Sequence, residues 1–421
     1  MSALNSKVWA IVAIVLLIVG FAGGYFSGMA AVPAKPAETV TVTETATTTV
    51  TQPATAAEPI KIGVLLELSG DLGPIGQRML LGAKLAAQQI NEQGGFGGRK
   101  VQLFIEDGET DTNKAVEAVK KLVEVQGVRI IVGPMISPST LAVAKYVNDR
   151  KVVCISPSAT AAKISELGDD YIFRVVGSDA FQSQALIDLI KQGGYEKIAT
   201  FVVNNDYGIG FEEAFVKEFG DKVVVTIRYD AAKGDYRTEL EQVKASGAEA
   251  VMFVGYPQSG TTIFRQALDM GLDNIAWFAA EGIAEKVMFK DPKAAEFMAK
   301  VAMVGTKPAS PTGYAHDLFV KRHREVFGKD PDLYADYTYD ATMLAIMAVA
   351  QAKSYSGEDI RAALKDVSTR YVGATGYKVF DENGDPMFFD YEVWKVVKTA
   401  EGYDFAIIGR WNAATGLVLK E

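Results

Sequence analysis

The sequence predicts an α/β protein built from two similar lobes, each with a parallel central sheet. Strand patterns alternate with helix patterns along most of the chain, which is the order that βαβ units produce. Two such alternating runs follow one another, and 421 residues exceed what one compact domain usually needs. A C-terminal segment of short strands and turns follows the second run.

The first alternating run begins with a buried strand and ends with another. Short continuous apolar stretches indicate its strands, and apolar residues at helical spacing indicate its helices. A glycine-rich segment at 94–98 follows a helix and precedes a strand, the reverse of the order in a phosphate-binding loop, so we interpret it as a turn. The expected strands are 60–68, 101–105, 129–132 and 152–155, and the expected helices are 75–93, 112–126 and 138–149.

The second run repeats this alternation and then changes character. Asn383-Gly384 lies between short strand patterns and is a hairpin signal. The expected strands of the run are 197–203, 223–229, 250–254 and 275–278, its helices are 210–219, 236–246 and 259–270, and the short strands of the tail are 376–380, 391–398 and 403–411.

The first 58 residues differ in composition from the body. An uncharged apolar run follows Lys7 and is long enough to span a bilayer, so we expect residues 1–32 to be a membrane anchor. A cleaved signal peptide is the alternative, because Ala30-Ala31 offers small residues for cleavage. No cysteine lies directly after the run, which excludes a lipoprotein anchor of the bacterial type. Residues 33–58 are rich in Thr and Pro and predict a stalk, either O-glycosylated or plainly disordered.

The composition excludes several classes of function. The net charge is −9 and no Lys/Arg cluster with interleaved aromatics occurs, so we expect no nucleic-acid partner. The single cysteine, Cys154, lies in an apolar run and is expected to be a small buried hydrophobe. His316 and His323 are the two histidines, and no set of metal ligands is predicted around them. Catalytic and cofactor-binding motifs are absent, so we expect neither an enzyme nor a cofactor.

Candidate site residues follow the strands, because ligands of open α/β sheets bind beyond the carboxyl ends of the strands. Ser137 and Ser158 lie in hydroxyl-rich turns that open helices, where free N–H groups suit a carboxylate, although both are equally consistent with plain N-caps. In the second alternating run, Tyr207 and Tyr256 could line an apolar pocket, and Glu281 could pair with an ammonium. An anion site facing a carboxylate is the complement of a zwitterion.

A series of short motifs then recurs in a recognisable order. The series starts with Ile-Gly-Val, Leu-Ser-Gly and Ile-Gly between residues 60 and 76, and continues with Gly-Gly-Phe-Gly-Gly-Arg from Gly94. Together the motifs extend over nearly all of residues 59–421, and they resemble the branched-chain amino acid-binding protein family of periplasmic solute receptors. The later motifs are at 133–140, Ile155-Ser-Pro-Ser-Ala-Thr160, Asp206-Tyr-Gly208, Glu281-Gly282 and Thr338-Tyr-Asp-Ala341.

This resemblance implies the type I periplasmic-binding fold. Two Rossmann-like lobes are then joined by a three-stranded hinge, and the ligand is held between them by hinge closure. On this basis lobe 1 comprises 59–176 and 307–374, and lobe 2 comprises 177–306 and 375–421.

The resemblance also implies roles for individual residues. Ile75 stands where leucine-binding relatives carry an aromatic residue, which changes the pocket for the ligand's side chain. The other implied positions are Ser137, Ser158, Ala159 and Thr160 around the ligand's α-carboxylate, Glu281 at its α-ammonium, and Tyr207, Tyr256 and Tyr334 as aromatic walls.

The function implied by the resemblance is that of an extracytoplasmic solute-binding protein of an ABC importer. It would capture a branched-chain or other aliphatic amino acid for a membrane permease while anchored by its N-terminal segment. A receptor for an amide, a urea-like compound or an aromatic carboxylate is an alternative in the same fold, and a sensory ectodomain is another. Glu281 bears on this choice, because a ligand without an amine would leave a buried carboxylate unpaired.

Overall fold

The computed structural model describes residues 58–310 and 312–420. The expected anchor at 1–32 and nearly all of the expected stalk at 33–58 lie outside the described residues. Residues 56–421 form one compact unit. Within the described part of the chain, no helix combines the length and the apolar character that crossing a membrane requires.

The first sheet has five parallel strands in the order β2-β1-β3-β4-β5. The inner strands β3 and β4 are buried along their whole length and β1 is buried except at Lys61, which explains their largely apolar sequences. Cys154 is fully buried in β4. The strands are β1 (Ile60–Leu66), β2 (Val101–Asp107), β3 (Ile130–Val132), β4 (Val153–Ser156) and β5 (Ile172–Arg174).

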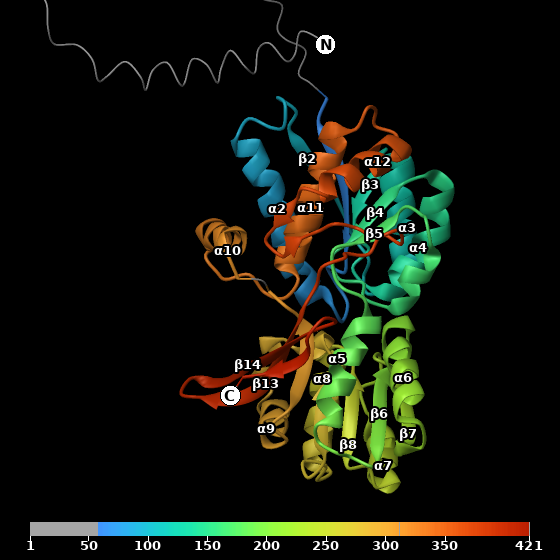
Figure 1. Ribbon diagram of the computed structural model, residues 1–421, viewed down its shortest axis with the longest axis vertical. Coiled ribbons are helices and arrows are strands. Elements are labelled where there is room, and N and C mark those ends of the chain that lie inside the picture. Colours follow the sequence, from blue (N-terminus) through green and yellow to red (C-terminus); the bar gives the residue numbers. More distant parts are fainter. Residues whose placement is uncertain (1–57, 311, 421) are drawn as a thin grey trace, which may run out of the picture. The chain divides into compact units, whose positions relative to one another are not determined.

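Helices pack around this sheet, as Figure 1 shows for α2, α3, α4, α11 and α12. The helix that the sequence predicts over 112–126 changes from an α-helix to a π-helix after Lys120. The helical segments of this part are α2 (Gly73–Glu92), α3 (Thr112–Lys120), η1 (Lys121–Val125), α4 (Ser137–Arg150), η2 (Ala162–Leu167), α10 (Tyr314–Phe327), α11 (Ala335–Gln351) and α12 (Gly357–Ser368).

The second sheet has eight strands in the order β15-β14-β13-β10-β9-β8-β6-β7. The five strands from β7 to β10 are parallel, whereas β13, β14 and β15 from the C-terminal segment add antiparallel pairs, so this sheet is mixed. The strands are β6 (Ile198–Val203), β7 (Val223–Tyr229), β8 (Ala250–Val254), β9 (Ala276–Ala279), β10 (Val304–Pro308), β13 (Tyr391–Thr399), β14 (Gly402–Asn412) and β15 (Gly416–Leu419).

The second sheet has its own set of helices, of which α5, α6, α7, α8 and α9 are labelled in Figure 1. Asn205 begins α6 by accepting hydrogen bonds from the N–H groups of Tyr207 and Gly208, as an N-cap does. The helical segments are α5 (Asp179–Lys191), α6 (Asp206–Phe219), η3 (Gly220–Lys222), α7 (Arg237–Ser246), α8 (Pro257–Asp269), η4 (Glu281–Ile283), η5 (Lys286–Lys290) and α9 (Pro292–Lys300).

Three segments of the chain lead from one sheet and its helices to the other. They run from β5 to α5, from β10 to α10, and from the short pair β11 (Val372–Gly373) and β12 (Gly376–Tyr377) to β13. The lobe boundaries stated above stay a prediction. The Asn383-Gly384 turn does not join two strands as a hairpin, since it closes a single bridge between Phe380 and Pro386. The α/β fold class is nevertheless the one that the sequence predicts.

Candidate ligand-binding site

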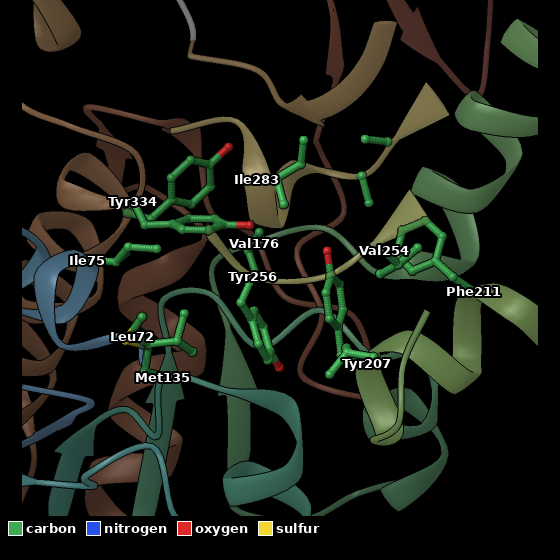
Figure 2. Close-up of a cluster of buried hydrophobic side chains, with 14 of the residues drawn as sticks. Leu72, Ile75, Met135, Val176, Tyr207, Phe211, Val254, Tyr256, Ile283 and Tyr334 are labelled. Carbon is green, nitrogen blue, oxygen red and sulfur yellow. The ribbon is translucent and has the colours of Figure 1, made fainter. Parts of the chain in front are cut away.

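A cavity of about 50 Å³ lies where loops from both sheets meet. The first sheet supplies the loops after β1, β3 and β4, and the second sheet supplies those after β6, β8 and β9, which agrees with ligand sites at the carboxyl ends of strands. Figure 2 shows side chains from both groups converging. The cavity is lined by Leu72, Ile75, Met135, Ile136, Ser137, Ser158, Thr160, Tyr207, Tyr256, Glu281, Gly282, Leu333 and Tyr334.

The structure brings together eight of the nine residues that the sequence singles out. Ala159 is the exception, because it is fully buried behind the cavity surface, where its N–H donates to Ser156 Oγ at 3.0 Å. The eight that line the cavity are Ile75, Ser137, Ser158, Thr160, Tyr207, Tyr256, Glu281 and Tyr334.

The two serines hold the loops after β3 and β4 to each other. Ser137 Oγ accepts from the N–H of Ala161 at 3.0 Å, and Ser158 Oγ donates to the carbonyl oxygen of Met135 at 2.7 Å. Neither serine is a helix N-cap, since α4 starts at Ser137 itself and the second loop leads into the 3-10 helix η2. The hydroxyl proton of Ser137 is therefore free to be donated to an acceptor in the cavity.

Further donors stand beside this hydroxyl. The first turn of α4 begins at the cavity, and the partial positive charge of a helix N-terminus favours an anion. Thr160 is buried and lines the cavity, and its N–H makes no hydrogen bond within the described part of the chain. This side of the cavity is suited to a carboxylate.

The opposite side of the cavity is acidic. Glu281 is 3% exposed, and its Oε2 accepts from Gln182 Nε2 at 2.7 Å. Burial raises the pKa of Glu281 to about 7, although the neighbouring Tyr207 hydroxyl works in the opposite direction. The protein thus holds an acidic group in a place where its negative charge is poorly solvated.

Asp179 is a second buried acid that the sequence analysis misses. It is the first residue of α5, is 2% exposed, and neither of its carboxylate oxygens makes a hydrogen bond. Burial, followed by the nearby charge of Glu281, raises the pKa of Asp179 well above its ordinary value. Ser178 and Asp179 read as an ordinary helix start, with Ser178 Oγ accepting from the N–H of Ala180, so the sequence gives no separate signal of a site.

Buried polar atoms without partners gather around Glu281. Such atoms are costly unless something else satisfies them. A donor with several N–H groups, such as an ammonium, would satisfy the acceptors among them. The atoms are both carboxylate oxygens of Asp179, Oε1 of Gln182 and the hydroxyls of Tyr207 and Tyr334.

Aromatic side chains form the walls between these polar groups. The rings of Tyr207 and Tyr256 are stacked, with centroids 5.9 Å apart and an interplanar angle of 15°. Asn205, the N-cap of α6, donates from Nδ2 to the Tyr256 hydroxyl at 2.9 Å, so one residue fixes both tyrosines. Tyr334 precedes α11 with a left-handed φ of 65°.

The remaining wall is apolar and comes mostly from the first sheet's loops. It offers no hydrogen-bonding side chain to a ligand group that lies against it. Among residues 58–310 and 312–420 no group of three or more His, Cys, Asp or Glu side chains is placed to hold a metal ion. The apolar wall consists of Leu72, Ile75, Met135, Ile136 and Leu333.

The two sheets and the polar cavity between their loops define a protein that binds a small molecule. The chain matches the periplasmic binding protein family over residues 59–400. It therefore belongs to the periplasmic binding protein family and is a solute-binding protein. Because this is a family of binding proteins, the expectation that the chain is not an enzyme is confirmed.

Two relatives are similar to most of this chain. An uncharacterized protein of Methanocaldococcus jannaschii is 27% identical over 89% of this chain and 95% of its own length. The leucine-, isoleucine-, valine-, threonine- and alanine-binding protein of Pseudomonas aeruginosa is 29% identical over 82% of this chain and 92% of its own length.

Solved structures share the fold. The branched-chain amino acid transporter substrate-binding protein LivJ from Streptococcus pneumoniae, in complex with isoleucine, is similar with a TM-score of 0.72 and 24% identity over 83% of this chain and 99% of its own. A Rhodopseudomonas palustris solute-binding protein in complex with 3,4-dihydroxybenzoic acid has a TM-score of 0.71 and 21% identity, over 85% of this chain and 98% of its own. These likenesses support the predicted type I periplasmic-binding fold.

Proposed function

We propose that this chain is the extracytoplasmic solute-binding protein of an ABC importer and that it binds a branched-chain or other small aliphatic amino acid. The observation that carries the proposal is the set of unpartnered polar atoms around Glu281 and Asp179. Buried Glu281 lines the same cavity as Ser137 and Thr160, and Asp179 lies beside Thr160, whose carbonyl oxygen accepts from the N–H of Asp179 at 2.8 Å. Acids and donors gathered at one cavity are what a zwitterion requires.

The ammonium of the ligand would lie between the acids, and its α-carboxylate would lie at the start of α4. Ser137 Oγ and the N–H of Thr160 donate to the carboxylate in this arrangement, and Ser158 and Ala159 hold the loops in place. A ligand without an amine would leave Glu281 buried without a cation and Asp179 with only the nearby charge of Arg174, which is unfavourable.

The side chain of the ligand would lie against the apolar wall. Ile75 and Leu72 make this wall aliphatic on the side of α2. This wall offers no hydrogen bond to the ring hydroxyl groups of an aromatic acid such as the one that the Rhodopseudomonas palustris protein holds, so it supports an aliphatic side chain on the ligand.

The transport role rests on the family and on the N-terminal segment. In the proposed arrangement residues 1–32 anchor the chain, residues 33–58 separate the body from the membrane, and closure of the two lobes presents a surface to the permease. The Pseudomonas aeruginosa relative, named for five amino acids, supports the amino-acid assignment.

The test is titration calorimetry on the full chain, unfolded and refolded to remove carried-over ligand. Leucine, isoleucine, valine and alanine, the amide of leucine and 4-hydroxybenzoate are the probes. We expect tight binding of one or more of the four amino acids. Glu281→Gln should weaken that binding by roughly 30-fold or more, because removing one member of a buried charge pair costs about 2 kcal/mol or more.

Glu67→Gln is the matched control for this substitution. Glu67 is another fully buried acid directly after β1, and it does not line the cavity. Its removal should leave the affinity unchanged. Binding of 4-hydroxybenzoate alone, or an amino-acid affinity that Glu281→Gln does not alter, would overturn the proposed ligand.

A further inference from the structure

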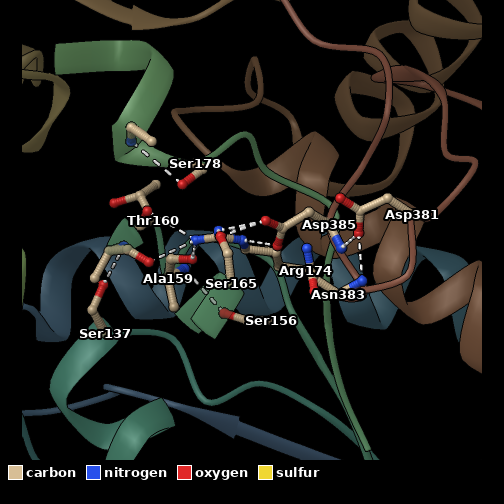
Figure 3. A network of polar contacts seen from close by, with 12 residues as sticks. Ser137, Ser156, Ala159, Thr160, Ser165, Arg174, Ser178, Asp381, Asn383 and Asp385 are labelled. Atoms are coloured by element: carbon tan, nitrogen blue, oxygen red, sulfur yellow. Dashed lines mark hydrogen bonds and ion pairs between the residues drawn. The ribbon is translucent and has the colours of Figure 1, made fainter. Parts of the chain in front are cut away.

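Arg174 is a fully buried cation that does not touch the cavity. It is the last residue of β5 and stands directly before the first segment that leads to the second sheet. Figure 3 shows its guanidinium between the loop that contains Ala159 and Thr160 on one side and Asp385 on the other. An unpaired buried charge is strongly unfavourable, so the guanidinium must be held by partners. These partners indicate the role of Arg174.

One side of the guanidinium donates hydrogen bonds to three consecutive carbonyl groups of the loop after β4. Nη1 donates to the carbonyl oxygens of Ala159 at 3.3 Å, Thr160 at 2.8 Å and Ala161 at 3.0 Å. Charge-assisted hydrogen bonds of this kind are stronger than those between neutral groups. The Thr160 carbonyl also accepts from the N–H of Asp179 at 2.8 Å, so Arg174 and the first residue of α5 together hold this part of the loop backbone.

The other side of the guanidinium is held by Asp385. Nε and Nη2 donate to the two oxygens of this carboxylate, the latter at 2.8 Å, and Nη2 also donates to Ser165 Oγ at 2.6 Å. Ser165 Oγ in turn donates to Asp385 Oδ2 at 2.6 Å. A bidentate pair of this geometry fixes the plane of the guanidinium as well as its position.

This clamp determines which way the loop's N–H groups point. In a trans peptide the C=O and N–H groups point in opposite directions. Because the Ala159 carbonyl points at Arg174, the N–H of Thr160 points away from it. The same holds for the next peptide, whose N–H on Ala161 reaches Ser137 Oγ at the cavity. The charge of Arg174 also lies at the carbonyl end of these peptide dipoles, which favours an anion at their N–H end.

We propose that Arg174, held by Asp385, is a positioning residue for recognition of the ligand's carboxylate. It acts by aiming the N–H of Thr160 and, through Ala161, the hydroxyl of Ser137 into the cavity. This inference rests on the proposed function, since it assigns those donors to the carboxylate. A purely structural ion pair would affect the stability of the chain but not the choice between a carboxylate and a neutral group.

The experiment compares leucine with leucinamide, which keeps the ammonium and the side chain but lacks the carboxylate. Asp385→Asn preserves the shape of the side chain and weakens the clamp. We expect it to lower the affinity for leucine by about tenfold, the size of one charge-assisted hydrogen bond, while the affinity for leucinamide changes by less than about threefold. The ratio of the two affinities should therefore fall. Equal losses for both compounds, or no loss for either, would overturn the positioning role.

Glu212→Gln is the matched control for Asp385→Asn. Glu212 is a buried carboxylate that accepts two hydrogen bonds from Arg228, at 2.8 and 2.9 Å, and neither residue lines the cavity. This variant should lower thermal stability without changing the ratio. If Asp385→Asn does not fold, Ser165→Ala removes one contact of the clamp and should lower the same ratio by a smaller factor.

The two proposals fail in different ways. If the wild-type protein binds 4-hydroxybenzoate and no amino acid, the proposed ligand is wrong, and the clamp is then tested with 4-hydroxybenzoate against 4-hydroxybenzamide. If the wild type binds leucine but Asp385→Asn leaves the ratio unchanged, the proposed ligand stands and the role of Arg174 is wrong.

Discussion

Two acidic side chains, Glu281 and Asp179, set the charge at one end of the cavity. Burial removes both side chains from water and raises both pKa values, and the charge of Glu281 raises the pKa of Asp179 further. Two interacting acids lose their protons in two steps that belong to the pair. Near neutral pH these two side chains therefore carry less negative charge than two ordinary carboxylates would. A bound ammonium would favour their ionised forms.

This pairing predicts that affinity depends on pH. An ammonium favours the ionised form of Glu281, whose pKa is about 7 without ligand. Below that pH the acid must release a proton for the ligand to bind, so the affinity should fall by roughly tenfold per pH unit and level off above pH 7. Calorimetry with leucine between pH 5 and pH 8.5 measures this slope. A flat profile across that range would contradict it.

The stability of the ligand-free protein should change in the opposite direction. An acid with a raised pKa favours the folded state in its neutral form, so its contribution is present at low pH and is lost as the pH rises through about 7. Burial raises the pKa of Glu67 to about 7 as well. Glu67→Gln should therefore alter how unfolding depends on pH but leave the pH slope of leucine binding unchanged.

At the scale of elements, two long helices place cavity residues from opposite directions. Ile75 and Leu72 lie at the start of α2, and Tyr334 lies at the start of α11. The two helices cross closely at Gly82, where an added Cβ would lie 2.0 Å from the carbonyl oxygen of Ala335 and 3.0 Å from the N of Tyr339. Gly82 therefore sets the spacing between both groups of wall residues.

We expect Gly82→Ala to force these helices apart. Overpacking in a core costs about 1–3 kcal/mol, and the upper end applies here because the obstacle is backbone. The shift also moves Tyr334, so the ligand affinity should fall together with stability in denaturant unfolding and calorimetry. Gly210→Ala in α6 is the control, since its Cβ meets nothing within 4 Å. That variant should gain about 0.5–1 kcal/mol, and a stable, fully active Gly82→Ala would contradict the spacing argument.

The sequence predicts most strands of both sheets, because buried parallel strands are continuous apolar runs, and the loops after them lead to the cavity. It misses β5, β10 and β15. The mixed character of the second sheet could not be predicted in this way. A strand pattern does not show which strand will be its neighbour in the sheet. β13 pairs with β10, which lies in a distant part of the chain. Asp179 has the sequence signature of any helix start, so burial alone distinguishes it.

Contacts between residues far apart in sequence could not be predicted either, because they depend on how the elements pack. Arg174 and Asp385 are 211 residues apart, and no local pattern marks either as a partner of the other. Ala159 shows the reverse case, because a motif places it at the site whereas the backbone turns it behind the cavity surface. The sequence motif identifies the loop, but the packing of the folded chain determines which atoms of the loop face the cavity.

At the scale of the whole molecule, one buried and one exposed ion pair join elements of the first sheet to elements of the second sheet. Arg78 of α2 pairs with Glu285, which follows η4, and also with Asp332 at 3.0 Å. The Glu285 side chain is 4% exposed. Lys163 of η2 pairs with Asp206 of α6 at 3.3 Å, and its side chain is 66% exposed. Both pairs connect elements of the first sheet with elements of the second, so both would separate if the two lobes open as the family resemblance implies.

Burial predicts that these two pairs affect ligand release differently. Without Arg78, closure would bury Glu285 with only the weaker influence of Lys307, and burial already raises the pKa of Glu285 to about 7. Arg78→Met should therefore raise the rate of leucine dissociation by roughly tenfold or more while the association rate changes little, because association starts from separated lobes. Lys163→Met should change dissociation by less than about threefold, since an exposed pair contributes about 0–1 kcal/mol. Stopped-flow fluorescence of the full chain measures both rates. If the two variants release leucine equally fast, the buried pair does not hold the closed form, and the retention of ligand must then come from the cavity contacts alone.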